Sequence, residues 1–170
     1  MIPAILASVL LAAVSTLGDF VWAYWNVRHR MGYGLIHGAI ICLCIGAVVG
    51  WRAGRPAAGA IVGPIVGVIA AGAFYLLAST LGWLAMLPAW MLFWICFAVL
   101  QARLSRDRTI GPALARGLLA AVLSGVAFYL VSGMWTNPPR GGPHYAGNFL
   151  RWGVAFLPGF LALFISRSKA

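Results

Sequence analysis

Long apolar stretches separated by short polar segments run along the whole chain. A transmembrane helix needs about 20 predominantly apolar residues to cross a hydrocarbon core about 30 Å thick. Stretches of this kind cover residues 3–22, 33–51, 57–80, 83–101, 111–132 and 148–165. They are apolar on every side, whereas the strands of a membrane barrel alternate between polar and apolar positions. The pattern therefore predicts an all-α fold, a polytopic membrane bundle of six transmembrane helices.

The composition supports a lipid environment. Of the 170 residues, 63% are hydrophobic and 8% are charged, whereas about 25% of the residues of a soluble domain are charged. A soluble fold of this size could not bury so much apolar surface. We expect one integral membrane domain over residues 1–170, embedded in the lipid bilayer of the cell membrane. The first stretch lacks the basic segment that precedes a signal sequence, so we expect a retained helix; cleavage there would leave five.

The positive charge of the chain, +10, lies at the ends of the predicted helices. Eight basic residues fall on the side where a six-helix arrangement puts both termini: Arg52, Arg55, Arg103, Arg106, Arg108, Arg116, Arg167 and Lys169. The other side holds four: Arg28, Arg30, Arg140 and Arg151. Because cytoplasmic loops collect Lys and Arg, we predict that both termini are cytoplasmic. This explains the charge without a nucleic acid, and we expect no nucleic-acid partner.

A weak internal repeat relates the second and third predicted helices to the fourth and fifth. An offset of 54 residues aligns Gly63 with Gly117 and residues 73–76 with residues 127–130. A parallel repeat of two helix pairs is one way in which transporter folds are built. Some identities would also arise by chance in so biased a composition, so duplication and chance are both open.

Asp19 and Asp107 are the two acidic residues of the chain. Asp107 lies among arginines in a predicted loop, where a solvated ion pair explains it. Asp19 lies near the outer end of the first helix, where a charge is costly unless it is paired or hydrated. It is either part of a functional site or a residue that pairs with an Arg and locks two helices together. Residues 147–149 echo residues 18–20, which puts Asn148 at a depth similar to that of Asp19.

The histidines leave two interpretations open. His37 lies about one turn inside the second helix, near the predicted depth of Asp19. The two side chains could relay protons, or His37 could form a hydrogen bond with a neighbouring helix. No two histidines share a helix face at the spacing of metal ligands, so we expect no metal site. We also expect no cofactor, because no cofactor-binding motif occurs in the sequence.

The predicted outer side is rich in aromatic and basic residues. An aromatic belt at the membrane interface explains part of this, but not the stiff, proline-rich segment around Arg140. Arginines there could offer charge-assisted hydrogen bonds to a carboxylate, a phosphate or a lipid headgroup. We therefore predict an outward-facing pocket between the first, second, fifth and sixth helices. Its candidate ligand-binding residues are Asp19, Trp22, Arg28, Arg30, His37, Arg140, His144, Asn148 and Arg151.

Small residues recur at every fourth position of the third helix, at Gly59, Gly63 and Gly67. Such a stripe lets a neighbouring helix, or a helix of a protein partner, approach closely. The three cysteines lie inside predicted helices, where a thiol behaves as a small hydrophobic group. The stripe therefore predicts close helix packing, and the cysteines indicate no redox chemistry.

Three classes of function fit these features. The outer residues favour a protein that binds or transports a small anionic or amphipathic molecule, and this is the function we predict. The small-residue stripe fits a non-catalytic scaffold or an accessory subunit of a larger complex. A membrane-embedded enzyme is less well supported, because few acids and bases could converge on a substrate and no catalytic residue stands out. A ligand adduct, a stoichiometric protein partner, or loss of turnover in Asp19→Asn would distinguish the three.

Overall fold

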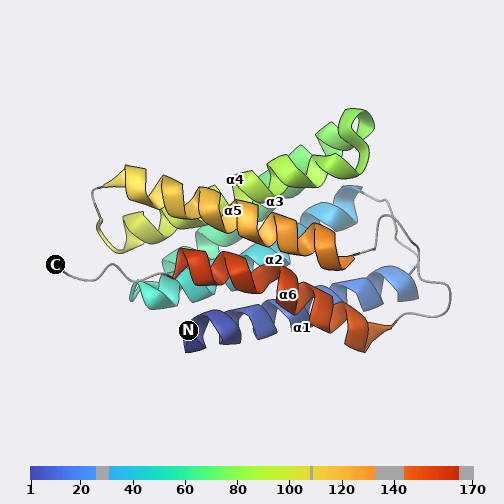
Figure 1. Cartoon of the computed structure of the whole chain (residues 1–170), viewed down its shortest axis with the longest axis horizontal. Helices are drawn as coiled ribbons and strands as arrows, with labels where there is room; N and C mark the ends of the chain where they lie inside the picture. The colour runs from blue at the N-terminus through green and yellow to red at the C-terminus, as the bar shows by residue number, and fades with distance from the viewer. Residues whose placement is uncertain (26–30, 108, 133–143, 165–170) are drawn as a thin grey trace.

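The chain folds as a bundle of long helices. The computed structural model describes residues 1–25, 31–107, 109–132 and 144–164, and within them it has no strand. The elements are α1 (Ile2–Tyr24), α2 (Met31–Arg52), α3 (Pro56–Leu81), the 3₁₀ turn η1 (Gly82–Ala85), α4 (Met86–Leu104), α5 (Ile110–Ser132) and α6 (Tyr145–Leu163) (Figure 1). The predicted all-helical polytopic bundle is confirmed.

Five of the helices, α1 to α5, are long and apolar enough to cross a membrane. Their outer faces carry large apolar side chains: Leu76 of α3 is 74% exposed and Leu130 of α5 is 79% exposed. Lipid is a matching solvent for such a surface, whereas water is not. The chain is therefore an integral membrane protein.

α6 differs from the other helices. Within its described length it is not among the apolar spans, because Asn148 and Arg151 lower its hydropathy. Five of the six predicted spans therefore meet the criterion of length and apolarity. α6 nevertheless belongs to the bundle, since it packs against both α1 and α5.

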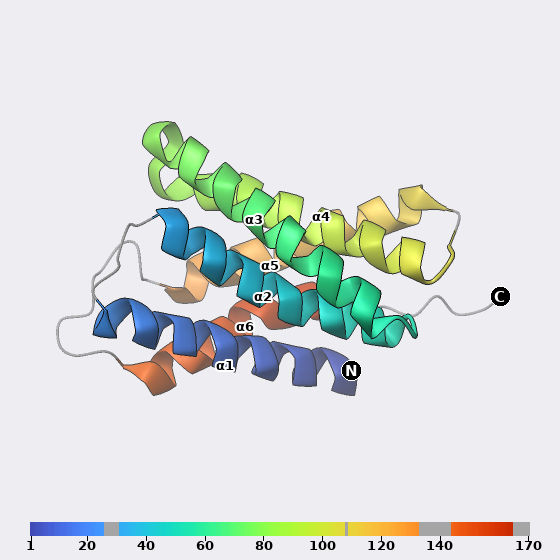
Figure 2. The same ribbon diagram turned by 180° about the vertical axis from the view of Figure 1, so that it is seen from behind.

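The helices run up and down, and most chain neighbours are also neighbours in space (Figures 1 and 2). α2 packs along α3, α3 on α4, and α4 on α5, while α6 lies beside α5 and α1. α1 begins at the end of the bundle where α6 ends. We call this the basic end, because its described residues include Arg52, Arg55, Arg103, Arg106 and Arg116. The opposite end is called the Asp19 end.

The contact between α2 and α3 is the most extensive in the bundle. A Cβ atom on Gly46 would overlap the backbone carbonyl of Gly59, and one on Gly63 would overlap that of Cys42. The small-residue stripe of α3 thus lets a neighbouring helix approach, as the sequence predicts. The neighbour is α2, whose own stripe was not recognised in the sequence and comprises Gly38, Cys42, Gly46 and Gly50.

Aromatic side chains fill the space between α4, α5 and α6. Trp90 on α4 contacts Phe128 on α5 and Phe156 on α6, with ring centroids 5.5 and 5.4 Å away. Trp94 is fully buried and covers Gly159, where a Cβ atom would overlap the indole ring. Trp152, Phe156 and Phe160 of α6 are spaced four residues apart, so they lie on one face of the helix. That face supplies the α6 side of the core.

Two serines hold α6 from opposite sides. Ser8 on α1 donates a hydrogen bond to the backbone oxygen of Gly153, 2.6 Å away. Ser124 on α5 donates one to the backbone oxygen of Ala155. Pro158 follows within one turn, and α6 continues through it without interruption. Because lipid offers no competing partner for such hydroxyl groups, these bonds tie the least apolar helix to its neighbours.

The helix pairs related by the 54-residue offset cross in a similar way. A Cβ atom on Gly63 would overlap the backbone of Cys42 in α2, and one on Gly117 would lie 2.7 Å from Cα of Ile95 in α4. The offset aligns the two glycines, and it aligns their partners to within one position. A duplicated helix pair would have this shared crossing point, and the repeat stays a prediction.

Candidate functional site

Asp19 lies near the end of α1, and its side chain faces α6. Its Oδ2 atom accepts a hydrogen bond of 3.1 Å from Nδ2 of Asn148 and one of 2.9 Å from Nε1 of Trp152. The two donors are four residues apart on α6, so they lie on one face of that helix. Both donors are neutral. One interpretation of the sequence was that Asp19 pairs with an arginine and so locks two helices together. The hydrogen bonds that join α1 to α6 here use two neutral donors instead.

The second carboxylate oxygen of Asp19 is open. Within the described residues both hydrogen bonds reach Oδ2, and Oδ1 accepts none. Oδ1 is also absent from the fully buried polar atoms of those residues that have no partner, so it is not completely enclosed by the bundle. A carboxylate has lone pairs for about four hydrogen bonds. The helix contact thus uses one side of Asp19 and leaves the other available to a ligand.

α2 covers the turn of α1 that carries Asp19. The Tyr33 hydroxyl donates a 3.1 Å hydrogen bond to the backbone oxygen of Gly18. The His37 ring occupies the space that a Cβ atom of Gly18 would need. The rings of Tyr33 and His37 stack at 6.0 Å, and Trp22 meets Tyr33 edge to face at 5.2 Å. Gly18 therefore permits an aromatic wall on one side of this turn, while α6 forms the other.

Trp152 joins the site to the aromatic core. Its indole nitrogen faces Asp19, and its ring stacks on Phe156 with centroids 5.8 Å apart. The ring also contacts Phe128 of α5 at 5.7 Å. A side chain that packs on two rings has little freedom to rotate. The aromatic core thus fixes the orientation of Trp152, which donates a hydrogen bond to Asp19.

Two further predicted site residues, His144 and Arg151, lie within the described residues but form no hydrogen bond or ring contact with this cluster there. His144 directly precedes α6 and is exposed, and the side chain of Arg151 is exposed on α6. Arg28, Arg30 and Arg140 lie outside the described residues. Of the nine candidates, the structure gathers four on facing parts of α1, α2 and α6: Asp19, Trp22, His37 and Asn148.

Two residues of the cluster were not among the predicted site residues. Trp152 donates the shorter hydrogen bond to Asp19, and Tyr33 binds the backbone at Gly18. Helical spacing carried a signal for both, since each lies four positions from a predicted site residue on the same helix. These residues are Asn148 for Trp152 and His37 for Tyr33.

The cluster has the chemistry of a recognition site. A carboxylate oxygen can accept a hydrogen bond or pair with a cation, and aromatic faces can cover an apolar group or a cation. Among the residues that the structure describes, no group of three or more His, Cys, Asp or Glu side chains could hold a metal ion. The described geometry therefore offers hydrogen bonding and aromatic contact.

Comparison of the chain with protein-family models, with curated proteins and with solved structures gave no match. A fold by itself does not define a function. The function is therefore inferred from the residues of this site.

Proposed function

We propose that this integral membrane protein binds a small amphipathic molecule at the Asp19 end, between α1, α2 and α6. The observation that carries the proposal is the open Oδ1 atom of Asp19, on a carboxylate whose other oxygen is fixed by Asn148 and Trp152. An ionisable side chain in a membrane helix is costly and marks a functional site by default. Here the carboxylate is held in place and still has an acceptor to offer.

The surroundings of Asp19 indicate what kind of molecule fits. A hydroxyl, amide or ammonium group would donate a hydrogen bond to Oδ1. The apolar part of the same molecule would lie against aromatic rings such as those of Trp22, Tyr33 and His37. Such a molecule has both a polar and an apolar part, and it could reach the site from the bilayer.

An anionic group on the ligand would use the arginines of this end. The sequence puts Arg28, Arg30 and Arg140 in the segments that join α1 to α2 and α5 to α6. Guanidinium groups are the preferred partners of carboxylates and phosphates, because they can donate two parallel hydrogen bonds. The proposed ligand therefore includes amphipathic molecules that carry an acidic group.

The structure around Asp19 favours binding of the molecule over its transport through the bundle. Trp152 leads from Asp19 directly into the rings of Phe128 and Phe156, which are buried. A packed aromatic core beside the site favours a pocket that is open at one end. The larger number of basic residues at the opposite end supports the proposal that the Asp19 end is the outer one, by the positive-inside rule.

The test is native mass spectrometry of the protein extracted in a mild detergent. The two acidic residues supply a matched pair of variants, because Asp19→Asn and Asp107→Asn make the same chemical change at opposite ends of the bundle. We expect the wild-type chain and Asp107→Asn to carry a small-molecule adduct, and Asp19→Asn to lose it. The mass and fragmentation of the adduct would give its chemical class.

Two results would contradict the proposal. An adduct that persists in Asp19→Asn would show that the ligand does not depend on this carboxylate. A wild-type chain that carries no small molecule but a stoichiometric protein partner would instead support an accessory subunit.

A further inference from the structure

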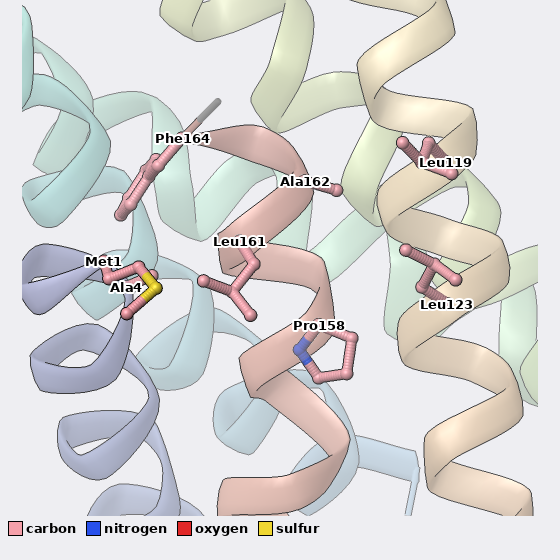
Figure 3. A pocket seen from close by; sticks show the side chains of 8 residues that line it. All are labelled: Met1, Ala4, Leu119, Leu123, Pro158, Leu161, Ala162 and Phe164. Carbon is pink, nitrogen blue, oxygen red and sulfur yellow. The ribbon is translucent and has the colours of Figure 1, made fainter. Parts of the chain in front are cut away.

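An apolar groove lies at the basic end, the end of the bundle opposite to Asp19. A groove of about 430 Å³ runs beside α6, between the start of α1 and the first half of α5. Its lining includes Ala4 of α1, Leu119 and Leu123 of α5, and Pro158, Leu161 and Phe164 at the end of α6 (Figure 3). The volume is within the range of ligand sites, and all the lining side chains are apolar.

The groove is open to the outer surface of the bundle. Leu123 is 44% exposed and Leu161 is 38% exposed, so both walls reach the outer surface of the bundle. Pro158 forms part of the lining and has no amide hydrogen to donate. A molecule in this groove would therefore find apolar contact and enter from the side, as an acyl chain does.

Two arginines, Arg52 and Arg116, lie near the groove at the basic end of the bundle. The guanidinium carbon of Arg52 lies 4.3 Å from the centroid of the Phe164 ring, which lines the groove. Arg116 precedes Leu119 by three residues on α5, so the two side chains lie on the same side of that helix. The Nε atom of Arg116 is buried and has no hydrogen-bond partner among the described residues.

We infer that this groove binds an anionic phospholipid, with an acyl chain between α1, α5 and α6 and the phosphate beside Arg52 and Arg116. An apolar groove alone would accept any lipid. Guanidinium groups at its end add charge-assisted hydrogen bonds that a phosphate with a net negative headgroup would use best. Basic pockets between helices on the cytoplasmic side are typical sites for anionic headgroups, and this is the end that the charge distribution makes cytoplasmic. The site is independent of the ligand proposed for Asp19.

The experiment compares lipid retention in native mass spectra of the full chain, after titration with phosphatidylglycerol or phosphatidylcholine. We expect the wild-type chain to retain phosphatidylglycerol preferentially. The double variant Arg52→Gln/Arg116→Gln should lose about thirtyfold in affinity for it, because each cation near the headgroup contributes about a factor of five. Arg103→Gln/Arg106→Gln removes the same charge from the same end and should keep the wild-type affinity.

A second variant tests the groove itself. Leu123 lines the groove and is partly exposed, so Leu123→Trp would put a larger side chain into the groove. The variant tests the contact with the acyl chain without changing a charge. It should lose phosphatidylglycerol while Asp19→Asn keeps it, which separates this site from the one at the Asp19 end. Equal retention of the two lipids by the wild-type chain, retention of phosphatidylglycerol by either groove variant, or its loss in the control variant would overturn the inference.

Discussion

At the scale of single residues, the two carboxylate oxygens of Asp19 differ in their surroundings. One carboxylate oxygen locks α1 to α6 through Asn148 and Trp152, and the other is open. The lock needs no cation, because two neutral N–H donors reach the same oxygen. In a bilayer such donors have no water to compete for them. A fixed carboxylate can therefore hold the helices and still recognise a ligand.

A double-mutant cycle between Asp19 and Trp152 measures the lock. Trp152→Phe keeps an aromatic ring against Phe156 but removes the indole N–H, and Asp19→Ala removes the acceptor. We expect each variant to unfold more easily and the two to be coupled by about 0.6 kcal/mol, with an upper bound of about 1.7 kcal/mol, as for other interhelical hydrogen bonds in membranes. Unfolding in mixed micelles gives these values. Strictly additive effects would show that the hydrogen bond does not form.

At the scale of helices, the bundle is held by two kinds of contact. α2 and α3 meet through glycines that bring their backbones together, whereas α4, α5 and α6 meet through interlocked aromatic rings. Both kinds rely on shape, because lipid tails are as apolar as the side chains and give helices no hydrophobic reason to associate. The contacts should therefore be sensitive to single added atoms.

Two glycines of α2 provide a matched test of this sensitivity. A Cβ atom on Gly46 would overlap the carbonyl of Gly59, whereas one on Gly32 would meet nothing within 4 Å. Gly46→Ala should destabilise the bundle by about 1–3 kcal/mol, because backbone atoms must move apart. Gly32→Ala should be neutral or stabilising by up to about 1 kcal/mol, because alanine is the better helix former. Thermal unfolding in detergent distinguishes them; equal effects would contradict the close contact of α2 with α3.

At the scale of the whole molecule, the apolar stretches predicted the helices well, because crossing a bilayer fixes both length and composition. The same pattern did not reveal which helices pack together. The stripe on α2 has the same spacing as that on α3, yet its partner becomes evident only in the folded bundle. Likewise, Asn148 was matched to the depth of Asp19 from a local sequence echo, whereas the role of Trp152 depends on α6 lying beside α1.

The arginines mark the limit of sequence reasoning about the site. The sequence predicts Arg151 as a site residue because it is one of the basic residues on the predicted outer side; in the structure its side chain is exposed on α6, away from the hydrogen bonds of Asp19, and its role in binding stays a prediction. A helix turns by about 100° per residue, so a neighbour in sequence often lies on another face. The carboxylate, the amide and the aromatic rings are therefore the part of the predicted site that the described structure brings together.

The orientation of the bundle is a further prediction at this scale. The basic end should be cytoplasmic, so Ser105→Cys on that end should react with a membrane-impermeant maleimide only after the cells are permeabilised. Ala146→Cys, near the start of α6 at the Asp19 end, should react in intact cells; both positions are exposed. The native cysteines would first be replaced by alanine. The reverse labelling pattern would place the Asp19 end inside the cell.

The most direct measurement of the central claim is the chemical accessibility of Asp19 in the folded protein. A membrane-permeant carbodiimide reacts with protonated carboxyl groups, and the two aspartates make the modified positions easy to map by mass spectrometry. In a mildly acidic bilayer preparation we predict modification of Asp19, and less of it when the bound small molecule is present. A chain denatured in detergent, in which both aspartates react, is the control. Modification of Asp107 alone in the folded protein would show that the Asp19 carboxylate is closed and would contradict a ligand site there.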